Sequence, residues 1–182
     1  IVQHNNYIGG RYSVLSEVGM LPAELMGLNA KKFKQLNNLI KNKNFINNLV
    51  INAGSIIYFL KNKKFNSVIV NYDEKSTNLF NWYQQLVAES LGKKSIGVLP
   101  IVSNMPKDNH SVMQLYLDGF KNNFFTIFYV KEVESEKINK KEILQEKNYL
   151  KNKDFDRIIY SQKKATENVF KRKKIPFRSF EI

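Results

Sequence analysis

Apolar residues recur every three or four positions along the first part of the chain, which is the spacing of helices with one buried face. The ranges 31–43 and 45–61 follow this spacing most regularly. Val14, Leu15 and Val18 would share one face of an earlier helix. Because proline is favoured in the first turn of a helix, Pro22 predicts the start of a new short helix.

The pattern changes after residue 66, where short apolar runs rich in β-branched and aromatic residues predict strands. The predicted strands are 67–72, 95–103, 123–133 and 175–182. Predicted helices lie between them, one ending at Leu91-Gly92, one over 110–119, and one or two over 138–173. Pro100 favours a position at a sheet edge or strand end.

Strands that alternate with helices predict parallel pairing through helical crossovers. We therefore expect an α/β fold, a doubly wound and mainly parallel sheet flanked by helices in three layers. In such folds ligands bind beyond the carboxyl ends of the strands. The 182 residues are expected to form one domain, and the absence of an initiator Met favours a start partway through a longer protein.

The amino-acid composition excludes several classes of protein and of binding partner. Hydrophobic residues make up 43% of the chain, which excludes a disordered protein, and no run is long enough for a membrane helix. The net charge of +13 is compatible with an anionic partner, but the lysines are spread out, with no basic run of five. This distribution favours a small anion over nucleic acid. The absence of cysteine excludes disulfides and fits a cytoplasmic protein.

Gln85 and Glu89 are the first candidate site. They are four residues apart, so they lie on one face of the predicted helix, and Glu89 falls in its last turn. A carboxylate there opposes the helix dipole. Held in the crevice at the junction with the next strand, and partly buried, Glu89 could act as a general base. The alternative is an ordinary solvated helix face.

Two further parts of the sequence are candidate functional sites. Gly9 and Gly10 precede Arg11 at a predicted helix start, where backbone N–H groups and a guanidinium could hold an anion. The alternative is a tight turn with a solvated arginine. His110 begins a predicted helix and could shuttle protons, or could simply be solvated. Together these residues indicate acid–base chemistry without a metal or cofactor.

Three stretches resemble successive motifs of the glucose-6-phosphate isomerase family. They are GGRYSVLSEVGMLP, FNWYQQLVAESLGKKS and DNHSVMQLYLDG, in the family's order and spacing over residues 9–119. The resemblance identifies the chain with the second of the family's two sugar-isomerase domains. It implies interconversion of glucose 6-phosphate and fructose 6-phosphate in glycolysis and gluconeogenesis, through a cis-enediol and with no cofactor or metal.

The resemblance also implies roles for individual residues. Glu89 corresponds to the base that moves a proton between C1 and C2. Arg11 corresponds to the residue that stabilises the charge of the intermediate, and Gln85 to one that holds the sugar, with Gly10 beside it. His110 corresponds to the histidine that assists ring opening from the other subunit. The implied partners are a hexose 6-phosphate and a second copy of the chain, with no nucleic acid and no membrane.

Two parts of the family pattern have no counterpart here: the phosphate-binding loop of the first domain and a ring-opening lysine beyond the matched region. The chain is thus expected to be a fragment or a reduced protein. The alternative function is a sugar-phosphate-binding module without turnover.

Overall fold

The computed structural model describes residues 2–132, 134–137, 150 and 153–182. They divide into two compact units, Ile1–Tyr58 and Phe59–Ile182. The predicted helix or helices over 138–173 fall partly outside the described residues. The candidate residues are distributed over both units, with Arg11 in the first and Glu89 in the second.

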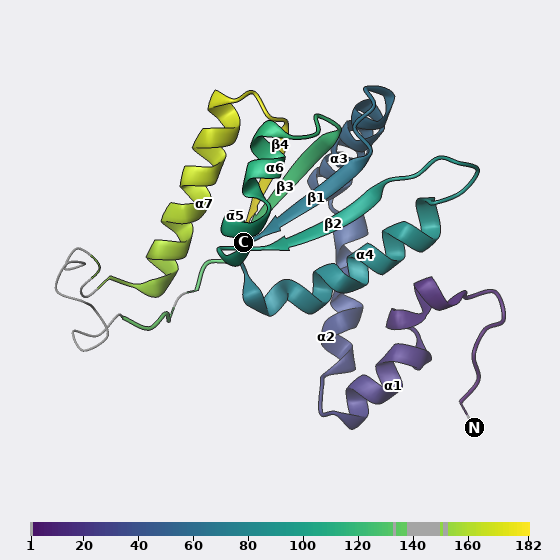
Figure 1. Ribbon diagram of the computed structural model, residues 1–182. Coiled ribbons are helices and arrows are strands. Elements are labelled where there is room, and N and C mark those ends of the chain that lie inside the picture. Colours follow the sequence, from purple (N-terminus) through teal and green to yellow (C-terminus); the bar gives the residue numbers. More distant parts are fainter. Residues whose placement is uncertain (1, 133, 138–149, 151–152) are drawn as a thin grey trace. The chain divides into compact units, whose positions relative to one another are not determined.

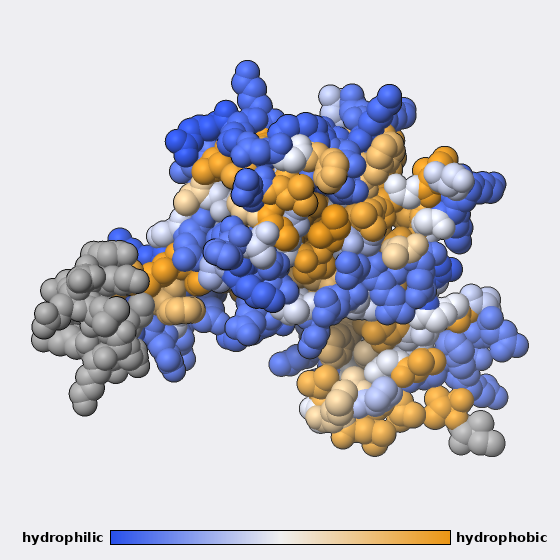
Figure 2. Space-filling view, in the orientation of Figure 1, coloured by the Kyte–Doolittle hydropathy of each residue, from blue (hydrophilic) through white to orange (hydrophobic). Residues whose placement is uncertain are grey.

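The first unit is helical, as predicted (Figure 1). Its elements are the 3-10 helix η1 (Gly10–Leu15), α1 (Glu17–Leu25), α2 (Ala30–Lys34), the 3-10 helix η2 (Gln35–Lys41) and α3 (Lys43–Lys61), which continues into the second unit. The predicted helix over 31–43 is thus a short α-helix followed by a 3-10 helix. Orange side chains gather over α1 in Figure 2, and the apolar Leu25 and Met26 are 81% and 72% exposed.

Pro22 lies inside α1 and does not begin a new helix, so that prediction was wrong. The helix begins earlier because Ser16 caps it, with the Ser16 hydroxyl accepting a hydrogen bond from the Val18 N–H at 3.3 Å. Gly19 has a packing role, because a Cβ there would collide with the carbonyl oxygen of Val14. A side chain at residue 19 would therefore push η1 and α1 apart.

The second unit contains a four-stranded parallel sheet in the order β2-β1-β3-β4. Its strands are β1 (Asn66–Asn71), β2 (Leu99–Asn104), β3 (Asn123–Tyr129) and β4 (Phe177–Glu181). Its other elements are η3 (Glu74–Ser76), α4 (Thr77–Leu91), α5 (Lys107–Ser111), α6 (Met113–Asp118) and α7 (Phe155–Arg172). The predicted helical range 110–119 is divided between α5 and α6.

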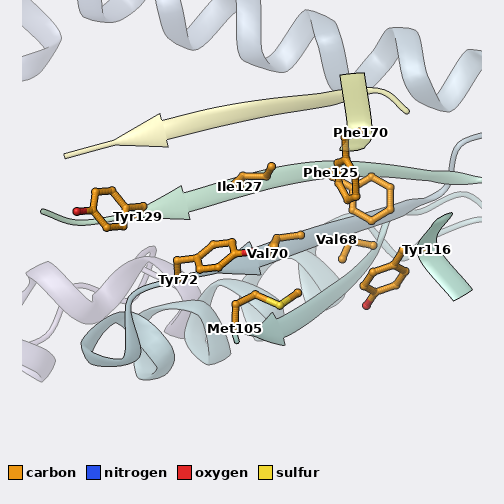
Figure 3. Close-up of a cluster of buried hydrophobic side chains, with 9 residues drawn as sticks. All are labelled: Val68, Val70, Tyr72, Met105, Tyr116, Phe125, Ile127, Tyr129 and Phe170. Carbon is orange, nitrogen blue, oxygen red and sulfur yellow. The ribbon is translucent and has the colours of Figure 1, made fainter. Parts of the chain in front are cut away.

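Helices cover both faces of the sheet. On one face Val68, Val70 and Ile127 join Phe125, which packs against Phe170 of α7 at a ring distance of 4.8 Å (Figure 3). On the other face Phe80 of α4 meets Phe128 edge-on. Strand residues alternate between the faces, so each face has its own apolar set.

The chain starts the sheet in the middle with β1, moves to β2 at one edge, and crosses back to β3 and β4. This order is that of a doubly wound α/β fold, and the predicted fold class is confirmed. The prediction that Pro100 lies at an edge is also confirmed, because β2 is an edge strand.

Candidate active site

Gln85 and Glu89 form a hydrogen-bonded pair on α4. The Gln85 Nε2 donates to Glu89 Oε1 at 2.9 Å, and both side chains are exposed. The helix ends two residues after Glu89, at Leu91, and the Gly92 N–H donates to the Ala88 carbonyl at 3.3 Å. The four-residue spacing therefore brings the Gln85 amide into contact with the Glu89 carboxylate, which is accessible to solutes.

Glu89 lies near the amino end of β2, not in the crevice at the carboxyl ends. A crossover helix runs back along the sheet, antiparallel to its strands, so its last turn comes to the edge where the next strand begins. The contact that shows this is a hydrogen bond from Gln84 Nε2 to the carbonyl oxygen of Pro100, at 2.8 Å. The expected crevice position and partial burial of Glu89 were wrong.

His110 lies at the opposite end of the same strand. It is an exposed residue of α5, which begins three residues after β2 ends at Asn104. Asp108 ties α5 to the strand, because its Oδ2 accepts a hydrogen bond from the Asn104 N–H at 2.8 Å. A six-residue strand is about 20 Å long, so Glu89 and His110 of one chain cannot both touch one hexose.

Gly10 and Arg11 belong to the first unit, in η1. The Ser13 hydroxyl, which is buried, donates to the Gly10 carbonyl at 2.9 Å and tightens this turn. A Cβ at Gly10 would meet no atom within 4 Å, so the backbone there is open to an approaching group. Arg11 is half-buried. The turn thus presents a guanidinium beside accessible backbone.

A cavity of about 330 Å³ lies at the carboxyl ends of the strands. Tyr72, Met105 and Tyr129 line its floor, after β1, after β2 and at the end of β3. Most of its charged residues are acidic: Asp73, Glu74, Glu132 and Asp156 against Lys75, which is itself paired with Glu132. A phosphate dianion would be repelled there. Asp73 and Glu74 directly follow the predicted strand 67–72, and they were the sequence signal of this acidic cavity that was missed.

An ionic cluster between α7 and β4 was also not predicted from the sequence. Lys163 is fully buried, and its Nζ pairs with Glu167 Oε1 at 2.8 Å and also with Glu181. Burial raises the pKa of Glu167, but hydrogen bonds from Lys163 and Ser179 outweigh it and lower that pKa overall. Hydrogen bonds from Lys163 and Lys164 lower the pKa of Glu181 to about 2. The two lysines of this cluster, Lys163 and Lys164, are both paired with Glu167 and Glu181. The cluster therefore has a structural role.

Within the described part of the chain, no group of three or more His, Cys, Asp or Glu is arranged to hold a metal ion. Of the helices in the same residues, none combines the length and apolar character needed to cross a membrane.

No family model matches the chain. Individual relatives do. The glucose-6-phosphate isomerase of Methanocaldococcus jannaschii is 35% identical over 179 residues, which cover 91% of this chain and 44% of that enzyme. The glucose-6-phosphate isomerase of Mycoplasmopsis pulmonis is 37% identical, over 87% of this chain and 39% of that enzyme. This chain thus spans less than half the length of these relatives.

Among solved structures, a hypothetical protein from Thermus thermophilus has the same fold. Its TM-score is 0.79 at 23% identity, and the match covers 96% of this chain and 44% of that one. From the sequence relatives it follows that the chain is homologous to a part of the glucose-6-phosphate isomerases, covering about 40% of their length.

Proposed function

We propose that this chain supplies the base of a glucose-6-phosphate isomerase. The observation that carries the proposal is the exposed Gln85–Glu89 pair, with its 2.9 Å hydrogen bond, in a chain homologous to these enzymes. A carboxylate that a substrate can reach is the kind of group that acts as a general base. The Gln85 amide fixes the direction in which the carboxylate points.

In the proposed reaction Glu89 removes the proton from C2 of open-chain glucose 6-phosphate. The electrons of the C–H bond form a C1=C2 double bond, and the π electrons of the C1 carbonyl move onto its oxygen O1. The product is a cis-enediolate. Protonation of its C1 by the same carboxyl group, with transfer of a proton between the two sugar oxygens, gives fructose 6-phosphate. Atoms and charge balance without a metal or redox cofactor.

Arg11 is proposed to stabilise the enediolate, because a fixed cation contributes most where negative charge develops. His110 is proposed to assist ring opening in a second copy of the chain. The separation of Glu89 and His110 by the length of β2 supports that arrangement. Gln85 and Gly10 are proposed to contact the sugar.

A chimeric enzyme tests the function. In the Methanocaldococcus jannaschii isomerase, the segment aligned with this chain is replaced by this chain, and turnover of fructose 6-phosphate is measured in a coupled assay. We expect the chimera to be active. Glu89→Gln should lower kcat at least about 100-fold, because an amide cannot accept the proton. Its affinity for fructose 6-phosphate should stay within about tenfold, since shape and hydrogen bonding are kept.

The matched control is Glu74→Gln, which neutralises another exposed carboxylate, on η3, and should leave kcat unchanged. A Glu89→Gln chimera that kept more than a tenth of the wild-type kcat would show that Glu89 is not the base. A chimera that bound fructose 6-phosphate without turnover would instead support a sugar-phosphate-binding module.

A further inference from the structure

We infer that Gln84 is a positioning residue for Glu89, an inference that rests on the proposed function. Gln84 precedes Gln85 on α4, and it was not among the candidate site residues predicted from the sequence. Its side chain is half-buried, and its Nε2 donates to the Pro100 carbonyl oxygen at 2.8 Å. The bond joins the helix that carries the base directly to the backbone of β2.

The Pro100 carbonyl needs such a partner. The N–H groups of Leu99 and Met105 donate toward the β1 side, to the carbonyls of Phe65 and Asn71, both at 2.8 Å. Backbone groups of alternate strand residues point in opposite directions, so the backbone of Pro100 points away from β1, toward the open edge. Proline has no N–H to leave unpaired there, and Gln84 satisfies its carbonyl.

The same bond helps to hold the half of α4 that carries Gln85 and Glu89. Phe80 is the one buried residue of α4, which the structure describes throughout, and it lies in the first half of the helix. The apolar residues in the turns of Gln85 and Glu89, among them Leu86 and Val87, are only half-buried. Glu89 lies five residues beyond Gln84, a rise of about 7.5 Å. The Gln84 bond therefore adds a direct link to β2 that helps to fix where the Glu89 carboxylate stands along the sheet.

Position matters more for a general base than for a surface residue. Proton abstraction needs the carboxylate within hydrogen-bond reach of the substrate proton, and a displacement of about 1 Å can reduce turnover about 100-fold. Ground-state binding of the sugar depends on several contacts and changes less. Loss of the Gln84 bond should therefore appear in kcat more than in KM.

Two substitutions at residue 84 distinguish the effect of its hydrogen bond from the effect of its side-chain packing. Gln84→Met keeps a similar length and removes the donor, whereas Gln84→Lys keeps an N–H donor. In the chimera, Gln84→Met should lower kcat at least about tenfold with KM within about threefold. Gln84→Lys should return kcat to within about threefold of wild type. The exposed Asn81 of the same helix provides the control, Asn81→Ala, which should match wild type.

Hydrogen exchange in the 182-residue chain gives an independent readout. In Gln84→Met the amides of residues 88–91 should exchange at least about fivefold faster than in wild type, while those near Phe80 keep their rates. Gln84→Lys should restore the slower exchange.

The outcomes distinguish the two proposals. An active chimera in which Gln84→Met keeps kcat within threefold, or in which Gln84→Lys fails to restore it, would overturn the positioning role alone. Unchanged exchange at 88–91 would do the same. A wild-type chimera without turnover would contradict the proposed function, and the positioning role with it.

Discussion

Glu89 and His110 lie at opposite ends of β2, Glu89 in the last turn of the helix before the strand and His110 in the helix after it. The strand has six residues and is about 20 Å long, so the two side chains of one chain cannot share a hexose. If both serve one reaction, they must come from two copies of the chain.

Mixed dimers test this arrangement. In the chimera, Glu89→Gln and His110→Ala are each expected to lose most activity. If His110 acts in the partner's site, a dimer of one chain of each kind has one site with both residues intact. Random mixing of equal amounts should then restore about a quarter of wild-type activity in a two-fold symmetric dimer. A mixture no more active than its parents would place both residues in the same chain's site.

Arg11→Lys should not behave as a conservative change. Lysine keeps the charge but loses the planar guanidinium, so we expect kcat of the chimera to fall about tenfold and more than KM rises. Steady-state kinetics in both directions would measure the two effects. Arg157→Lys, at an exposed arginine of α7, is the control and should leave both constants unchanged. An effect on KM alone would assign Arg11 to binding of the ground-state sugar.

The 182-residue chain alone should bind fructose 6-phosphate weakly and turn it over negligibly. Charge-assisted hydrogen bonds to the phosphate supply much of the affinity for such a ligand. The family resemblance assigns those bonds to another domain, and the cavity at the carboxyl ends of the strands is acidic. Calorimetric titration and a coupled assay would measure both properties. Micromolar affinity with turnover like that of the chimera would place the phosphate site within these residues.

Glu181 should make the stability of the chain depend on acid pH. Hydrogen bonds from Lys163 and Lys164 lower its pKa from 4.5 to about 2. A carboxyl group whose pKa is lower in the folded state stabilises the fold above its unfolded pKa. Its contribution is therefore complete above about pH 5 and is lost as the pH falls from 4.5 toward 2.

The urea midpoints of wild type and Glu181→Gln at pH 7 and pH 2.5 would measure this effect. We expect wild type to be more stable at pH 7 and the difference to shrink at pH 2.5. The Glu181 side chain is 44% exposed, so the difference at pH 7 should also decrease in about 1 M salt. A difference that does not depend on pH would show that the Glu181 charge adds nothing to stability.

Much of the fold follows from the sequence alone, because local patterns determine local structure. Alternation of helical and strand-like runs predicted the four parallel strands, and the missing N–H of Pro100 predicted an edge. The four-residue spacing of Gln85 and Glu89 predicted their shared helix face, where they form their hydrogen bond. Each of these predictions depends on residues close together in the chain.

The tertiary structure decided what depends on distant residues. Only the packing of α4 against β2 shows that Glu89 stands at the amino end of the strand and that Gln84 meets Pro100, sixteen residues away. Lys163 is an ordinary helical lysine in the sequence, and it becomes a buried ion-pair partner because β4 brings Glu181 beside it. Periodicity tells which face of an element is apolar, but the order and direction of packed elements decide which side chains meet across them.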